Sequence, residues 1–200
     1  MIFKMKEKDF FQIKSNTLNV KTGDVLISEP FLNDHYFGRS LILIVDHNEE
    51  TGSLGIIINK RLSLKINEII DDFPVFDGYV YLGGPVATDS VFFTHTLGVM
   101  IPDSYEVREG LYWSGNFNAV KALIKEGLIT KYDIRFYIGY AGWDAGQLKD
   151  ELQRNSWIVN DIPTKLILNT NPTKMWSNFV KDMGGKYKLW SRFPVNPNDN

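Results

Sequence analysis

The segment Gly139–Leu148 reads Gly-Tyr-Ala-Gly-Trp-Asp-Ala-Gly-Gln-Leu, which places three glycines and a tryptophan between a strand-like and a helix-like stretch. Glycine has no Cβ, so it permits turns and close backbone approaches that other residues do not. The residues before it, Ile134–Tyr140, alternate apolar and polar, and the following Gln147–Asn155 carries Leu148 and Leu152 on one helical face. We therefore predict a strand, a glycine loop and a helix at this point.

The rest of the chain predicts more strands than helices. We expect strands at Asp24–Ser28, Leu41–Val45, Leu54–Asn59, Tyr79–Leu82, Val91–Thr94, Val99–Ile101, Leu111–Trp113, Trp157–Val159 and Lys165–Leu168. Turn-forming residues in Asp46–Ser53 join the second and third strands into a hairpin. Ser63, Asn116 and Thr173 are residue types that cap helices, and each precedes apolar residues at helical spacing.

These elements do not alternate regularly as strand and helix, so the predicted class is α+β. A chain of 200 residues with 44% hydrophobic and 23% charged residues is globular in composition. We expect one compact domain over residues 1–200, with a mobile tail at 194–200.

Composition also excludes several kinds of chemistry. The chain has no cysteine, which excludes disulfides, thiol nucleophiles and thiolate metal sites. The net charge of −2 lacks the basic balance that nucleic-acid binders use to neutralise phosphates, which disfavours DNA as a partner. No apolar run has the length of a signal peptide or a membrane span, so we expect a cytoplasmic protein without a membrane partner.

Several ordered motifs resemble the YqgE/AlgH family of bacterial proteins, over roughly Gly23 to Trp176. The matching residues are Gly23–Pro30, Phe37, Ser40, His47, Gly52, Gly55, Asn59, Gly83–Val86, His95, Gly139–Leu148, Glu151 and Trp157. The family is described both as uncharacterised and as transcriptional regulators. The resemblance implies a curved, barrel-like mixed sheet flanked by three or four helices, and it implies no established reaction. The chain departs from the family pattern at Lys60-Arg61, Thr94 and Asp144-Ala145.

Two glycine segments give the sharpest site hypothesis. Gly83-Gly84 follows one predicted strand, and Gly142, Trp143, Gly146 and Gln147 follow another. Amide groups exposed by such loops can hold an anion, helped by the positive end of a helix dipole. If the two loops meet, they line one pocket for a small anionic ligand. The alternative is that the glycines only permit tight turns while Trp143 fills the core.

The histidines give a second hypothesis from another class. His47 lies beside Asp46, and His95 follows Asp89 by six residues, so either could work as a base with a nearby carboxylate, with or without a metal. No spacing typical of a metal site is present, and we predict neither a metal nor a cofactor.

The sequence therefore favours a non-enzymatic regulatory or ligand-binding protein, whose partner is a small anion or another protein. An enzyme and a DNA-binding regulator remain the alternatives. Arg39 and Arg135 are the cations of most interest, because they lie within strand-like segments, where Glu29 or Asp24 would be their partners. The clusters Lys60-Arg61 and Lys186-Tyr187-Lys188 could meet phosphates, but basic residues of this kind are ordinarily solvated surface.

Overall fold

The computed structural model describes residues 14–32, 34–169 and 171–193, so the predicted tail at 194–200 lies outside the described residues. The strands are β1 (Val25–Ser28), β2 (Leu41–Asn48), β3 (Gly52–Ile57), β4 (Arg61–Lys65), β5 (Tyr79–Leu82), β6 (Val86–His95), β7 (Tyr105–Arg108), β8 (Leu111–Trp113), β9 (Ile134–Trp143) and β10 (Trp157–Asn160). The helices are η1 (Ile66–Glu68), η2 (Gly98–Met100), α2 (Phe117–Lys125), α3 (Gln147–Gln153), α4 (Thr164–Asn169), α5 (Pro172–Asp182) and α6 (Tyr187–Trp190), of which η1 and η2 are 3-10 turns.

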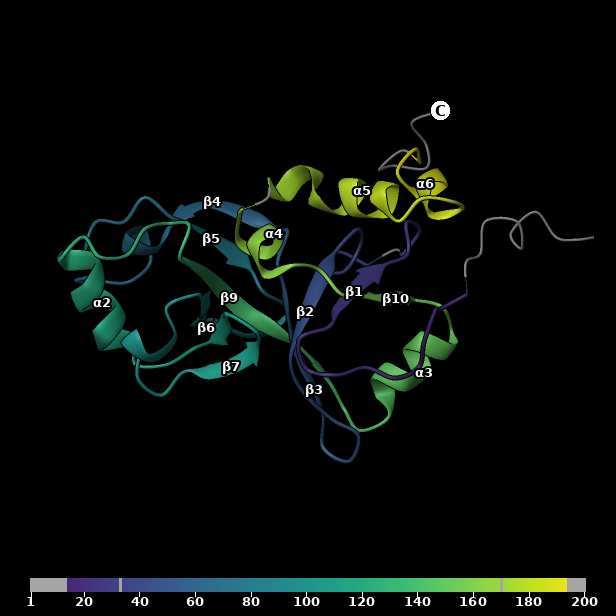
Figure 1. Cartoon of the computed structure of the whole chain (residues 1–200), viewed down its shortest axis with the longest axis horizontal. Coiled ribbons are helices and arrows are strands. Elements are labelled where there is room, and N and C mark those ends of the chain that lie inside the picture. Colours follow the sequence, from purple (N-terminus) through teal and green to yellow (C-terminus); the bar gives the residue numbers. More distant parts are fainter. Residues whose placement is uncertain (1–13, 33, 170, 194–200) are drawn as a thin grey trace, which may run out of the picture.

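The ten strands form one sheet with the order β10-β1-β2-β3-β9-β6-β8-β7, and β5 joins it beside β9 with β4 on its outer side. All pairs are antiparallel except β5 with β9. Figure 1 shows β9 crossing the middle of the molecule, with α2 at one end, α3 at the other and α5 above the sheet. The predicted combination of helices and a large mixed sheet is confirmed.

Strand β9 holds the two halves of the sheet together and bends at Gly139. Its first part, up to Ile138, pairs with β5, and its last part, Ala141–Trp143, pairs with β3 on the same edge. Gly139 lies between these parts with φ +68°, a left-handed conformation that favours glycine. The predicted glycine loop is therefore mostly strand, and the chain turns only after Trp143.

Both faces of the sheet are covered around β2. Alternate residues point to opposite faces of a strand, so Leu41 and Leu43 join the cluster beneath α5 and α6, whereas Ile42 and Ile44 join the cluster beneath α3. A third cluster, centred on Phe136, packs β5, β6 and β9 against α2. This two-sided burial explains why the first five residues of β2, Leu41–Val45, are all apolar.

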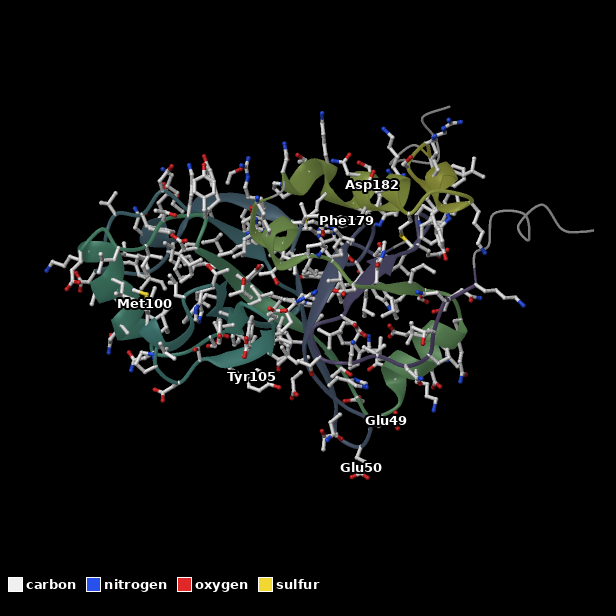
Figure 2. The ribbon with its side chains drawn as sticks, viewed as in Figure 1. Glu49, Glu50, Met100, Tyr105, Phe179 and Asp182 are labelled. Atoms are coloured by element: carbon white, nitrogen blue, oxygen red, sulfur yellow. The ribbon has the colours of Figure 1, made fainter. Side chains whose placement is uncertain are left out.

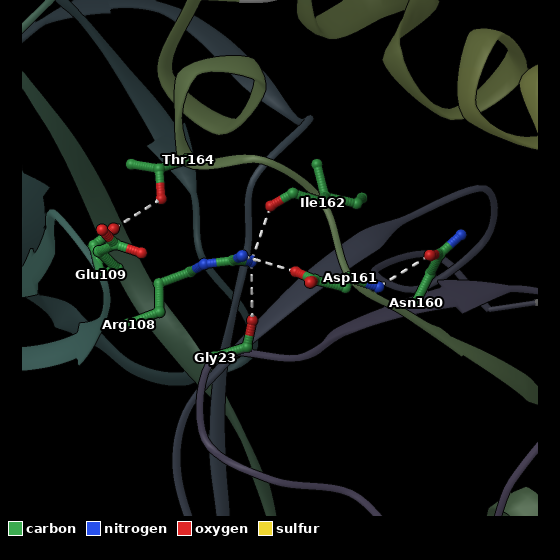
Figure 3. Close-up of polar contacts among 7 residues, drawn as sticks. All are labelled: Gly23, Arg108, Glu109, Asn160, Asp161, Ile162 and Thr164. Atoms are coloured by element: carbon green, nitrogen blue, oxygen red, sulfur yellow. Dashed lines mark hydrogen bonds and ion pairs between the residues drawn. The ribbon is translucent and has the colours of Figure 1, made fainter.

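The sheet is not closed into a barrel, because β7 and β10 end the strand path without pairing to each other. A side chain spans this gap instead (Figure 3). Arg108 at the end of β7 donates to the carbonyl oxygen of Ile162 at 2.7 Å and to that of Gly23 at 3.3 Å, and it forms an ion pair with Asp161. The sheet is therefore open, and the expected barrel-like form is not confirmed.

Three predicted short elements have a different structure. Ser63 lies within β4 and caps no helix, Val99 lies in the turn η2, and Lys165–Leu168 belongs to helix α4. Apolar runs this short do not separate a strand from a helix by their pattern alone. Pro163 explains α4, because proline suits the start of a helix and its carbonyl accepts from the amides of Leu166 and Ile167.

The helix ends agree better with the sequence. Asn116 caps α2 by accepting from the amide of Ala119, as predicted. Helix α5 is capped by Asn171 with Pro172 following, two residues before the predicted Thr173.

The described residues contain five α-helices, more than the three or four expected. None of the helices in the described part of the chain is long and apolar enough to cross a membrane.

Candidate functional site

Gly83-Gly84 packs against Gly139 and Tyr140, which precede the predicted loop Gly142–Gln147. A Cβ on Gly83 would overlap the carbonyl oxygen of Gly139, and one on Gly84 would overlap the backbone of Tyr140. Gly83 also donates to Ile138 and accepts from Ile57, so it is a bridge between β9 and β3. The backbone of Gly83-Gly84 therefore packs directly against the backbone of β9.

Trp143 and Gln147 take part in a group of hydrogen bonds to Glu151 of α3. The indole nitrogens of Trp143 and Trp157 both donate to Oε2 of Glu151, at 2.9 and 2.7 Å, and the Gln147 amide donates to Oε1 at 3.0 Å. Trp143 is only 6% exposed. This contact fixes α3 on the sheet, and Gly142 lies in the strand that leads to it.

His47 and Gly146 line a small cavity of about 160 Å³ between the β2–β3 hairpin and the start of α3, which we call the hairpin pocket. Nδ1 of His47 lies 2.7 Å from the hydroxyl of Ser53. Asp144 lines the same cavity, and Glu49 lies at its edge, at the hairpin tip that Figure 2 shows projecting from the molecule.

His95 lies elsewhere and is fully buried. Its Nδ1 accepts from the amide of Leu97 at 3.2 Å, so Nε2 carries the hydrogen and donates to the carbonyl of Ser114 at 3.1 Å. Burial lowers the pKa of His95, and Tyr112 stacks on its ring at 5.5 Å. The eight predicted site residues thus lie in separate places, with only His47 and Gly146 sharing a cavity.

A larger cavity, of about 250 Å³, lies where β4, β5 and β9 meet the last turn of α4. Figure 1 shows β4, β5 and α4 in the upper left part of the molecule, with β9 running from there toward the centre. We call it the cationic cleft, because three cations and one carboxylate line it. Its lining residues are Arg61, Asp77, Gly78, Tyr79, Tyr81, Lys131, Tyr132, Ile134, Arg135, Leu168 and Asn171.

The ion pairs of Asp77 show how the charges in the cleft are balanced. Its carboxylate binds Lys65 at 3.0 Å and Lys131 at 2.7 Å. Hydrogen bonds from Lys131 and Lys65, with their charges, lower the pKa of Asp77 from 3.8 to about 2. One carboxylate is thus shared by two ammonium groups, which leaves positive charge in excess.

Arg61 adds a cation at the rim. Its guanidinium lies 4.5 Å from the ring centre of Tyr79, close enough for a cation–π contact. No carboxylate lies within ion-pair distance of Arg61 among the residues that the structure describes. Since ring contact leaves the charge uncancelled, this guanidinium is suited to bind an anion.

Arg135 forms the floor of the cleft, and it is 6% exposed. It donates to the carbonyl of Ile58 at 3.0 Å, to that of Ile167 at 2.7 Å and to that of Leu168, and its guanidinium lies 4.2 Å from the ring centre of Tyr81. The two α4 carbonyls are at the negative end of that helix, which favours a cation. Within the described ranges Arg135 has no carboxylate partner, so its charge adds to the field in the cleft.

Two residues of this cleft are noticeable in the sequence. Arg135 stands out as a cation within a strand-like segment and Lys60-Arg61 as a basic pair, and the structure places Arg61 and Arg135 in the same cavity. Lys60 instead donates to the carbonyl of His35, and burial lowers its pKa. Asp77, Lys131 and the tyrosines lie in loops and on strand ends, where spacing carries no signal about tertiary neighbours.

The fold and the cleft define an α+β protein with an open mixed sheet and a cavity lined by cations. A model of the AlgH-like family matches residues 25–188. The chain belongs to the AlgH-like family, which confirms the resemblance seen in the sequence.

Relatives with similar sequences are UPF0301 proteins. One from Bacteroides thetaiotaomicron is 43% identical over 195 residues, which cover 97% of this chain and 98% of the relative. Another, from Cytophaga hutchinsonii, is 41% identical over 179 residues, which cover 89% of this chain and 98% of the relative.

Two solved structures share the fold. Protein DIP2367 from Corynebacterium diphtheriae superimposes with a TM-score of 0.76 at 22% identity, covering 94% of this chain and 99% of that one. The solution structure of the AlgH protein from Pseudomonas aeruginosa gives a TM-score of 0.70 at 28% identity, with coverages of 90% and 97%.

Proposed function

We propose that this chain is a non-enzymatic regulatory protein that binds a small anionic ligand in the cationic cleft. The observation that carries the proposal is that three cations line the cleft with one carboxylate, Asp77, which Lys65 and Lys131 already share. Lysine and arginine keep their protons at neutral pH, so the groups at the cleft suit binding better than proton transfer.

The position of the cleft supports a regulatory role. Arg135 in its floor binds the end of α4, and Asn171 in its wall caps the start of α5. An anion bound beside Arg135 would lower the cost of keeping that buried charge and so stabilise the junction between the sheet and the C-terminal helices. Ligand occupancy would then change the stability of α4 and α5.

Isothermal titration calorimetry with ribose 5-phosphate and inorganic pyrophosphate tests the proposal. We expect binding that weakens at high salt, because exposed charges are screened. The double variant Arg61→Ala/Lys131→Ala should bind these anions at least about tenfold more weakly, because it removes the Coulomb attraction of two cations. The matched control is Lys125→Ala, which removes an exposed lysine at the end of α2. Equal binding by both variants, or no binding by the wild type, would overturn the proposal.

The hairpin pocket favours a second candidate function. The Ser53 hydroxyl lies 2.7 Å from Nδ1 of His47, with Asp144 lining the same cavity. Such a pair is the beginning of a nucleophile and base arrangement, in which histidine takes the serine proton. Labelling with a fluorophosphonate, read as a mass increase on Ser53, tests it. Labelling that is lost in His47→Gln would support an enzyme, and an unlabelled wild-type protein would exclude this candidate.

A further inference from the structure

We infer that the ligand of the cationic cleft carries an aromatic ring beside its anionic group, as a mononucleotide does. The inference rests on the proposed anion binding and goes beyond it by naming the ligand class. It starts from the two tyrosines at the rim of the cleft: Tyr79 is 40% exposed and Tyr132 is 61% exposed.

Each rim tyrosine is paired with a cation. Arg61 lies over the Tyr79 ring at 4.5 Å, and Lys131 lies 5.7 Å from the ring centre of Tyr132. A ligand with only a charged group would use the cations and leave both rings in water. A ligand that joins a phosphate to a planar ring would contact a cation and a ring together, and exposed aromatic rings are the surfaces on which bases stack.

Asn171 supplies a polar group in the same wall. Its Oδ1 accepts from the amide and hydroxyl of Thr173, at 3.1 and 2.6 Å, which fixes the side chain as the cap of α5. The Nδ2 group is a donor, and it has no hydrogen-bond partner among the residues described on either side of position 170. A donor of this kind matches the ring nitrogens and carbonyl oxygens of a base.

The cavity volume limits the size of the ligand. At about 250 Å³ the cleft lies just below the range of roughly 300–1,000 Å³ that is usual for drug-sized ligands. A single nucleoside phosphate fits this scale if part of it stays at the open rim. A dinucleotide or a polynucleotide would extend far beyond the residues that line the cleft.

Three probes separate the ring from the phosphate: AMP, ribose 5-phosphate and adenosine. Calorimetry should give AMP an affinity at least about tenfold above that of ribose 5-phosphate, which is the order that stacking of one base contributes. Adenosine should bind more weakly than AMP, because it lacks the phosphate. Tyr132→Ala should remove the preference for AMP, and Tyr132→Phe should keep it, because the stacking face remains.

Tyr105→Ala is the matched control, since Tyr105 is 54% exposed on β7 and does not line the cleft. Equal affinities for AMP and ribose 5-phosphate would overturn the inference about the ring while leaving the anion site intact. Binding of neither phosphate would overturn the proposed function itself. An AMP preference unchanged in Tyr132→Ala would also contradict the assignment of the ring to this rim.

Discussion

Gly83 and Gly139 touch through their backbones, and neither position has room for a side chain. A Cβ on Gly83 would overlap the Gly139 carbonyl oxygen, and a Cβ on Gly139 would contact the carbonyl oxygens of Gly84 and Val86. The contact lies where β9 passes from its pairing with β5 to its pairing with β3. These glycines are therefore needed for the bend that joins the two halves of the sheet.

Replacing Gly83 by alanine should destabilise the protein by about 3 kcal/mol or more, or prevent folding, because backbone on both strands must move. Gly127→Ala is the control: its φ of +72° is strained for alanine, but a Cβ there meets nothing within 4 Å. Its cost should be only about 1 kcal/mol. Urea unfolding measures both. A Gly83→Ala variant as stable as Gly127→Ala would show that the contact is not tight.

Glu151 should be the main polar support of α3. Glu151→Ala leaves the indole groups of Trp143 and Trp157 without their acceptor, so we expect a loss of about 2–4 kcal/mol in the free energy of unfolding. Glu151→Gln keeps an acceptor and should lose less. Glu126→Ala, at the exposed end of α2, should change stability by less than about 0.5 kcal/mol. Similar losses for Glu151→Ala and Glu126→Ala in urea unfolding would contradict this role.

Stability should fall as the pH falls below about 6.5, because His95 is buried without its charge. Burial lowers its folded-state pKa from the ordinary value of 6.5, so the unfolded chain binds the proton more readily. The neutral His95 contributes its full stabilisation at pH values above the unfolded-state pKa. As the pH falls below that value, the free energy of unfolding decreases by up to about 1.4 kcal/mol per pH unit.

Urea unfolding between pH 8 and pH 5 measures this slope. His95→Gln should be less stable at high pH, because the bond to Ser114 and the stacking on Tyr112 are altered. Its stability should also depend less on pH over this range. If the wild type and His95→Gln have the same slope, the pH dependence arises from other groups.

Asp77→Asn should strengthen anion binding in the cationic cleft. The substitution removes the only acidic residue among the lining residues and releases the ammonium groups of Lys65 and Lys131. We expect about three- to tenfold tighter binding of ribose 5-phosphate by calorimetry, with little change in stability because the ion pairs are exposed. Weaker binding would mean that the carboxylate itself contacts the ligand.

The sequence predicts the local structure well where one residue type dictates it. Asn116 caps a helix, and the hairpin of β2 and β3 forms. In both cases the cause is local. Helix α4 was wrongly expected to be a strand, because its six residues have no clear period and its C-terminal carbonyls are bound by the distant Arg135.

The candidate site is harder to predict for the same physical reason. Arg61, Asp77 and Lys131 come from three separate loops and strands, and only the folded sheet brings them together. The hypothesis of one pocket at the glycines assumes that a close approach of main chain serves a ligand. In the structure Gly83-Gly84 packs against β9, and the cations line a different cavity.

Nuclear magnetic resonance of the nitrogen-15-labelled protein during titration with AMP tests the central claim most directly. The account predicts progressive shifts in the amide signals of Arg61, Tyr79, Lys131 and Tyr132, with those of His47, Ser53 and Gly146 unmoved. Shifts confined to the hairpin pocket, or no shifts at all, would contradict the assignment of the cationic cleft as the ligand site.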